Sequence, residues 1–214
     1  MAGFFIAFEG IDGAGKLTQL LKTHEWLEGL GYSVGWSSEP NDRSSPIGQR
    51  IRSILRHEVP APADAVEFQR MYVIDRAQDL FAFIQPRLEE GMIYLIERFG
   101  LSTIAYGMLS GASAEVFIKL HEAVLGPSMR WPDLTILLNC SVETAIRRRH
   151  AVSGESPQFF ERFTLLERVR EHYLALASHP YFRAGVAVVG GEPPADEVFE
   201  HVKKFIEPRL PRRA

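Results

Sequence analysis

The chain has 214 residues, of which 46% are hydrophobic and 24% are charged, and its formal net charge is −3. This composition is typical of one globular domain with a substantial core, and the weak negative charge excludes a general affinity for nucleic acid. The single cysteine, Cys140, excludes an internal disulfide and is typical of a reducing compartment. No apolar run approaches the roughly 20 residues that span a bilayer, and the apolar start "GFFIAF" is too short for a signal peptide. We therefore expect a cytoplasmic protein that does not enter a membrane.

The apolar residues alternate between short dense runs and longer stretches with helical spacing. Strands are predicted at residues 3–9, 32–38, 92–97, 134–140 and 186–190, and the dense apolar run of the first is typical of a strand buried on both faces. Helices are predicted between them at residues 16–30, 46–57, 64–89, 113–125, 141–150, 158–178 and 193–207. Strands that alternate with helices indicate a parallel sheet. The sequence therefore predicts one α/β domain over residues 1–214, with a central five-stranded parallel sheet flanked by helices on both faces.

A glycine-rich segment, "FEGIDGAGKLTQ" (8–19), joins the first predicted strand to the first predicted helix. Its spacing G-x-x-x-x-G-K is that of a phosphate-binding loop, in which glycines let backbone N–H groups point at phosphate oxygens. The helix N-terminus adds the positive end of its dipole, and Lys16 reaches the β- and γ-phosphates. The alternative is a glycine-rich turn that contains a lysine by chance, but the position between strand and helix favours the phosphate loop. We therefore expect ATP to bind Gly10, Ile11, Asp12, Gly13, Ala14, Gly15, Lys16, Leu17 and Thr18.

This segment resembles the opening of thymidylate kinases, and four further segments similar to that family follow in the same order. They are "SEPNDRSSPIGQRIR" (38–52), "YVIDRAQ" (72–78), "IERFGLSTIAY" (96–106) and "PDLTILLNCSVETAIRRR" (132–149). The resemblance implies a P-loop kinase fold with a small lid at roughly residues 149–158. It also implies transfer of the γ-phosphoryl group of ATP to dTMP, giving dTDP, with Mg²⁺ as cofactor and a homodimer as the assembly.

Four residues are expected to carry the chemistry: Lys16, Arg98, Asp12 and Arg148. Arg98 directly follows a buried strand, and ligands of parallel sheets bind at the carboxyl ends of the strands. Its planar guanidinium group can donate two hydrogen bonds to phosphate oxygens. The resemblance assigns it to the acceptor phosphate, whereas the alternative is a surface pair with Glu97. Arg148 lies among three consecutive arginines whose side chains point in different directions on a helix. It matches the family's lid arginine that closes over ATP, and a solvated helix end is the alternative.

The resemblance also places the acceptor nucleotide. Tyr72 and Arg76 share one helix face, and the family uses these positions to stack on thymine and to hydrogen-bond it. The alternative is a core aromatic with an Asp75–Arg76 pair. Ser102 and Tyr106 are also four residues apart and either line the nucleoside pocket or simply pack. The complete set expected to bind dTMP is Glu39, Pro40, Tyr72, Arg76, Arg98, Ser102 and Tyr106.

The chain departs from the family pattern in four places. Leu17 lacks the hydroxyl that normally ligates Mg²⁺, and Thr18 is rotated by about 100°, so it could replace that hydroxyl only from a distorted helix start. Glu97 stands where the family has Asp and, like Asp12, could reach the metal through water. Ser38 replaces an arginine, although Arg43 lies close in sequence, and the lid "HAVSGESPQFF" (150–160) lacks an Asp-Arg-x-Glu run. Since Mg²⁺ is held largely by substrate phosphates, we expect a weakened metal site in a working kinase.

Two other readings remain open. A deoxynucleoside kinase would share "IERF" and would use a carboxylate base such as Asp12 or Glu97 on a neutral hydroxyl. A nucleotide-binding protein that has lost catalysis would explain Leu17 and the altered lid. The seven histidines are scattered without metal-type spacing, so we expect structural or surface roles for them, and Cys140 is expected to be a small buried filler.

Overall fold

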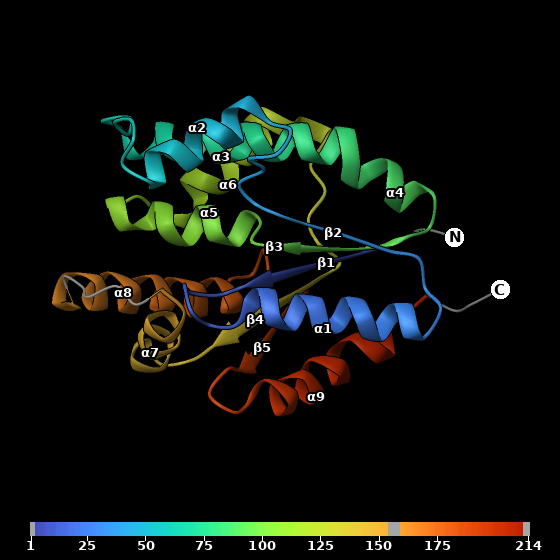
Figure 1. Ribbon diagram of the computed structural model, residues 1–214. Helices are drawn as coiled ribbons and strands as arrows, with labels where there is room; N and C mark the ends of the chain where they lie inside the picture. Colours follow the sequence, from blue (N-terminus) through green and yellow to red (C-terminus); the bar gives the residue numbers. More distant parts are fainter. Residues whose placement is uncertain (1–2, 154–158, 212–214) are drawn as a thin grey trace.

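The computed structural model describes residues 3–153 and 159–211, without the side chains of residues 150–162. The greater part of the predicted lid, residues 154–158, therefore lies outside the described residues. A central sheet runs through the molecule (Figure 1). Its five strands are all parallel and are arranged in the order β2-β3-β1-β4-β5. They are β1 (Phe4–Glu9), β2 (Val34–Ser38), β3 (Ile93–Glu97), β4 (Leu134–Asn139) and β5 (Val186–Gly190).

Helices cover both faces of this sheet, as predicted (Figure 1). Helices α1 (Lys16–Gly29) and α9 (Ala195–Ile206) lie along one face. The others are α2 (Pro46–Leu55), α3 (Ala65–Asp79), α4 (Gln85–Glu89), α5 (Gly100–Gly107), α6 (Ala114–Leu125), α7 (Val142–Ser153) and α8 (Phe159–Ser178). No helix in the described part of the chain is both long and apolar enough to cross a membrane.

The central strand β1 shows why the sheet must be covered on both sides. All six of its residues are buried. Phe5 packs in one apolar cluster with Val73 of α3, while Ile6 packs in another with Leu20 and Leu27 of α1. Successive side chains of a strand point to opposite faces, so a continuous apolar run is stable only between two layers of helices.

Two of the predicted helical segments differ from the structure. The stretch 64–89 is α3 and α4 joined by a wider π-helical turn at Leu80–Ile84, in which the Gln85 N–H donates to Leu80 O. Pro86 explains this turn, because its ring has no N–H and would clash with the carbonyl four residues earlier. Helix α5 was not predicted as an element of its own, and α7 continues three residues beyond the predicted end at 150.

Candidate active site

The phosphate-binding loop lies between β1 and α1 and adopts a conformation that only glycine tolerates at several points. Gly13 has φ of 87°, in the left-handed region. A Cβ atom there would also lie 2.2 Å from the carbonyl oxygen of Ala145 in α7. Conformation and space therefore both exclude a side chain, and the loop keeps its backbone open to a ligand.

Lys16 begins α1 beneath this loop. Its Nζ donates to the Ile11 carbonyl at 2.9 Å and lies 3.9 Å from Glu97 Oε1, and only 4% of the side chain is exposed. Burial and the charge of Arg98 lower the pKa of Lys16 to about 8, although Asp12, Glu97 and Glu9 oppose the shift. The three carboxylates therefore do not fully offset the cost of burying this ammonium group. The phosphates of a nucleotide would add the negative charge that stabilises it.

Arg98 follows β3 and has φ of 64°, a left-handed conformation that is uncommon for a non-glycine residue. Its Nη2 donates to Asp12 Oδ1 at 2.5 Å, and its guanidinium lies 5.5 Å from the Tyr106 ring centre. The alternative of a surface pair with Glu97 is wrong, because Arg98 pairs with Asp12 instead. The hydrogen bonds of Arg98 to Asp12, Ser102, Tyr173 and the Gly10 carbonyl all use its Nη1 and Nη2 atoms.

Asp12 connects the loop to two arginines. Besides Arg98 it accepts from Arg149 Nη1 at 3.3 Å. Burial opposes ionisation of Asp12, but Arg98, Lys16 and Arg149 outweigh it and hold the pKa of the Asp12 carboxyl well below its usual range. Asp12 is therefore a fixed anion that holds both guanidinium groups at the loop.

A fully buried carboxylate, Glu9, lies at the end of β1 beside Arg98. It accepts hydrogen bonds from the Phe99 and Ser102 backbone N–H groups at 2.8 and 3.1 Å, and from the hydroxyls of Ser102 and Tyr173. Burial raises the pKa of Glu9, and these hydrogen bonds and Arg98 oppose that shift. Sequence reasoning missed this group, although an acidic residue at the end of a buried apolar strand is a signal for it.

A cavity of about 610 Å³ opens beside Arg98. Six of the seven residues expected to bind dTMP line it together, which are Glu39, Pro40, Tyr72, Arg98, Ser102 and Tyr106. Lining residues that were not anticipated include Arg52, Arg56, Gln69, Thr103 and Arg149. Arg43, considered as a substitute for the arginine missing at Ser38, lines a different cavity. The cations that line the cavity beside Arg98 are therefore other arginines.

Arg76, the seventh expected residue, is completely buried. Its Nε donates to Glu39 Oε1 at 2.9 Å and its Nη2 pairs with Glu39 Oε2, so the carboxylate is held at two points. Nη2 also donates to Thr103 Oγ1 at 3.0 Å. The alternative Asp75–Arg76 pair is wrong, since Asp75 accepts from the Asn41 backbone instead. Arg76 thus holds two residues of the cavity wall, and its bond to the base stays a prediction.

His121 completes the surroundings of Arg76. Its Nδ1 lies 2.7 Å from the Phe117 carbonyl, and its Nε2 contacts Arg76 Nη1. Burial and the charge of Arg76 lower the pKa of His121 to about 3. The ring is therefore neutral, with Nδ1–H as donor and Nε2 as acceptor. Burial also raises the pKa of Glu39, which Arg76 opposes.

The three arginines of α7 point in different directions, as expected for neighbours on a helix. Arg147 donates to Thr144 Oγ1 at 3.1 Å. Arg148 donates to the carbonyls of Gly191, Glu192 and Pro193 at 2.8, 3.1 and 3.2 Å. Arg148 therefore holds the loop between β5 and α9, whereas Arg149, which was not singled out, lines the cavity beside Arg98.

The metal ligands expected from the sequence lie around Lys16. Helix α1 starts regularly, with the Gln19 N–H donating to Gly15 O at 3.0 Å, so the distortion that Thr18 would need is absent and Thr18 is exposed. Leu17 is also exposed. The described residues contain no group of three or more His, Cys, Asp or Glu able to hold a metal by themselves. Glu97 and Asp12 remain as carboxylates beside the loop, which suits an ion held mainly by phosphate oxygens.

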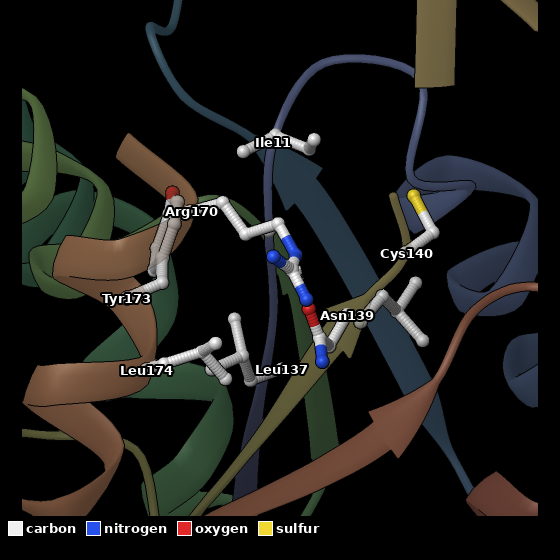
Figure 2. Close-up of a pocket in the computed structure, with 9 residues that line it drawn as sticks. Ile11, Leu137, Asn139, Cys140, Arg170, Tyr173 and Leu174 are labelled. Atoms are coloured by element: carbon white, nitrogen blue, oxygen red, sulfur yellow. Dashed lines mark hydrogen bonds between the residues drawn. The ribbon is translucent and has the colours of Figure 1, made fainter. Parts of the chain in front are cut away.

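A second, much smaller cavity lies between α8 and the ends of β1 and β4 (Figure 2). Figure 2 shows Arg170 reaching Asn139, to which its Nε donates at 2.8 Å, with Cys140 and Ile11 nearby. Its volume of about 10 Å³ holds at most one water molecule. This space is therefore a packing gap, and Cys140 is the buried filler that was expected.

Comparison with known proteins agrees with this geometry. The family model for thymidylate kinase matches residues 8–202. A thymidylate kinase from Maridesulfovibrio salexigens is 33% identical over 214 residues, which cover 96% of each chain. One from Pelobacter propionicus is 40% identical over 182 residues, covering 82% of this chain and 81% of the relative.

The fold has a counterpart among solved structures. A crystal structure of thymidylate kinase from Ehrlichia chaffeensis is similar with a TM-score of 0.73, covering 97% of this chain and 100% of that one. At 22% identity this likeness shows the fold alone. The family match over most of the chain, together with the relatives above 30% identity, decides membership. The chain belongs to the thymidylate kinase family.

Proposed function

We propose that this protein transfers the γ-phosphoryl group of ATP to dTMP and releases ADP and dTDP. The observation that carries the proposal is the meeting of two cationic sites at Asp12. The phosphate loop and Lys16 lie on one side, and Arg98 and the acceptor cavity lie on the other. Phosphoryl transfer needs two phosphates held in line with their charge neutralised, and this arrangement places a binding group for each.

The roles of the residues follow from their positions. Backbone N–H groups of Gly10–Gly15 and the Lys16 ammonium bind the donor phosphates. Arg98 binds the acceptor phosphate through its Nε–H and its second Nη2 hydrogen. A phosphate oxygen is already an anionic nucleophile, so no side chain needs to remove a proton. Tyr72, whose ring meets Phe68 edge-on at 5.5 Å, offers an aromatic face for the base.

Glu97 and Asp12, the carboxylates beside the loop, would hold a magnesium ion that is bound mainly by phosphate oxygens. The ion would supply charge neutralisation between the β- and γ-phosphates. Glu97 is suited to this role because 22% of its side chain is exposed and its nearest charged partner, Lys16, is 3.9 Å away. Leu17 has no oxygen to offer such an ion, so the metal would depend more on the donor phosphates than it would with Ser at this position.

We further propose that the enzyme is a cytoplasmic homodimer whose partners are nucleotides rather than nucleic acid. The single, buried Cys140 and the net charge of −3 support a reducing compartment and the absence of a polyanion partner. Sedimentation velocity tests the dimer directly, since a single species at the mass of one chain would contradict it.

A coupled assay of ADP release with different acceptors tests the activity. We expect release with dTMP, less with dUMP, and none above background with thymidine. The Arg98→Ala variant should raise the KM for dTMP strongly, while Arg183→Ala, at an exposed arginine outside the cavity, should behave as the native chain. Activity on thymidine alone would favour a deoxynucleoside kinase. ATP binding without ADP release for any acceptor would favour a binding protein that has lost catalysis.

A further inference from the structure

The contacts of Glu9 are divided between its two oxygens in a way that bears on Arg98. Oε1 accepts from the backbone N–H groups of Phe99 and Ser102 at 2.8 and 3.1 Å. Oε2 accepts from the Ser102 hydroxyl and from the Tyr173 hydroxyl at 3.1 Å. Oε1 therefore accepts only from backbone N–H groups, and Oε2 accepts from two side-chain hydroxyl groups, one from α5 and one from α8.

The two hydroxyls are oriented by this carboxylate. Four donors meet the two oxygens of Glu9, which is the arrangement of a carboxylate that only accepts hydrogen bonds. The Ser102 hydrogen therefore points at Glu9, and the Tyr173 hydrogen points at Glu9 or at Ser102 Oγ, 2.7 Å away. The lone pairs of both oxygens are then left for Arg98 Nη1, which lies 3.1 Å from Ser102 Oγ and 3.4 Å from Tyr173 Oη. Glu9 thus makes both hydroxyls acceptors toward the guanidinium.

The other oxygen of Glu9 secures the backbone on which Arg98 stands. Arg98 has φ of 64°, a conformation disfavoured for any residue with a Cβ and retained only where the surroundings impose it. The residue that follows it, Phe99, donates its N–H to Glu9. The carboxylate therefore restrains the turn and the side chain of Arg98 at the same time.

We propose that Glu9 is the positioning residue of Arg98: acting through Ser102 and Tyr173, it aims the guanidinium at the acceptor phosphate. This rests on the proposed function, in which Arg98 binds that phosphate. Glu9 itself is completely buried and is absent from the lining of the acceptor cavity. Its effect on the substrate must therefore pass through Arg98 rather than through direct contact.

The Glu9→Gln variant keeps the shape of the side chain and replaces one oxygen by an N–H donor. At the Oε2 position the amide would turn the hydroxyl hydrogens toward Arg98, and at the Oε1 position it would face two backbone N–H groups. Loss of a hydrogen bond to a charged group typically weakens binding by about tenfold or more. We expect the KM for dTMP and its dissociation constant to rise by about tenfold, and the KM for ATP by less than about twofold.

A double-variant cycle separates positioning from a general structural role. In the Arg98→Ala background the guanidinium is gone, so Glu9→Gln should change the dissociation constant of dTMP by less than about twofold. Calorimetric titration with dTMP measures all four proteins without depending on turnover. An effect of Glu9→Gln that is equally large in both backgrounds would overturn the proposal, as would native affinity in the folded single variant.

Tyr173→Phe provides a second route if Glu9→Gln does not fold. This variant removes one oriented hydroxyl and leaves the ring in place, so the affinity for dTMP should fall by about fivefold. In the Arg98→Ala background the same change should leave the affinity for dTMP unaltered. Tyr181→Phe, at an exposed tyrosine outside the cavity, is the matched control. Native affinity in Tyr173→Phe would then refute the inference. Failure of the unmodified chain to phosphorylate dTMP would instead refute the proposed function, before any variant is made.

Discussion

Removal of the Arg76 guanidinium should destabilise the protein far more than removal of a comparable surface arginine. Arg76 and Glu39 form an ion pair in which the side chains are 0% and 2% exposed. The Arg76→Met variant leaves the Glu39 carboxylate buried without a partner, and it also removes the donors to Thr103 and His121. Breaking a buried pair in this way costs about 3–5 kcal/mol.

Urea unfolding followed by circular dichroism measures this loss. With a slope of about 3 kcal/mol per molar urea, the unfolding midpoint should fall by roughly 1–1.7 M. Arg70→Met, on the same helix, is the matched control, because its pair with Glu67 at 3.2 Å is about half exposed on both sides. That variant should lose less than about 1 kcal/mol.

The same reasoning predicts a rescue and a pH dependence. Burial raises the pKa of Glu39, and the Arg76→Met variant removes the charge of Arg76 that opposes this shift. A raised carboxyl pKa means that the folded state binds the proton more tightly, so Arg76→Met should lose stability as the pH rises above the ordinary pKa of about 4.3. Adding Glu39→Gln should restore at least about 2 kcal/mol at neutral pH. A loss under 1 kcal/mol in Arg76→Met, or no recovery in the double variant, would refute this account.

Three further changes probe the phosphate loop. Gly13→Ala should cost more than about 2 kcal/mol of stability and abolish ATP binding in calorimetry, because φ is 87° and the added Cβ would lie 2.2 Å from Ala145 O. Gly29→Ala, which meets nothing within 4 Å, should stabilise α1 by up to about 1 kcal/mol, and equal effects of the two changes would contradict the packing argument. ATP affinity should fall as the pH rises through the pKa of Lys16 at about 8, since the cation is lost above it. Lys16→Arg should flatten that profile, and a flat native profile would count against a depressed Lys16 pKa. Leu17→Ser should raise turnover at limiting Mg²⁺ while Leu17→Ala does not, and an unchanged metal dependence would place residue 17 outside the metal shell.

Much of the fold was predictable because the three central strands β1, β3 and β4 are buried on both faces. A strand such as β1 must then be apolar throughout, which separates it from the helices by pattern alone. The local parts of the site were also predictable. Gly10 to Lys16 form one continuous motif, and Ser102 and Tyr106 lie on one face of α5 because they are four residues apart. Their common cavity lining follows from spacing along the chain.

The remaining parts of the site depend on contacts between distant segments. Glu9 and Tyr173 are 164 positions apart, and no spacing rule links a strand end to a residue in α8. The choice of Arg149 rather than Arg148 at the acceptor cavity depends on how α7 is rotated about its axis. That rotation is set by packing against the loop and the sheet, so the sequence of three arginines does not reveal it.

The contact between Gly13 and Ala145 joins two backbones with no side chain in between. The phosphate loop and the first turn of α7 therefore behave as one mechanical unit, since close-packed atoms transmit displacement rather than absorb it. A displacement of the loop backbone would therefore reach the helix that carries Arg148 and Arg149. Such a displacement would be passed on through Arg148 to the segment after β5 and through Arg149 to the cavity beside Arg98.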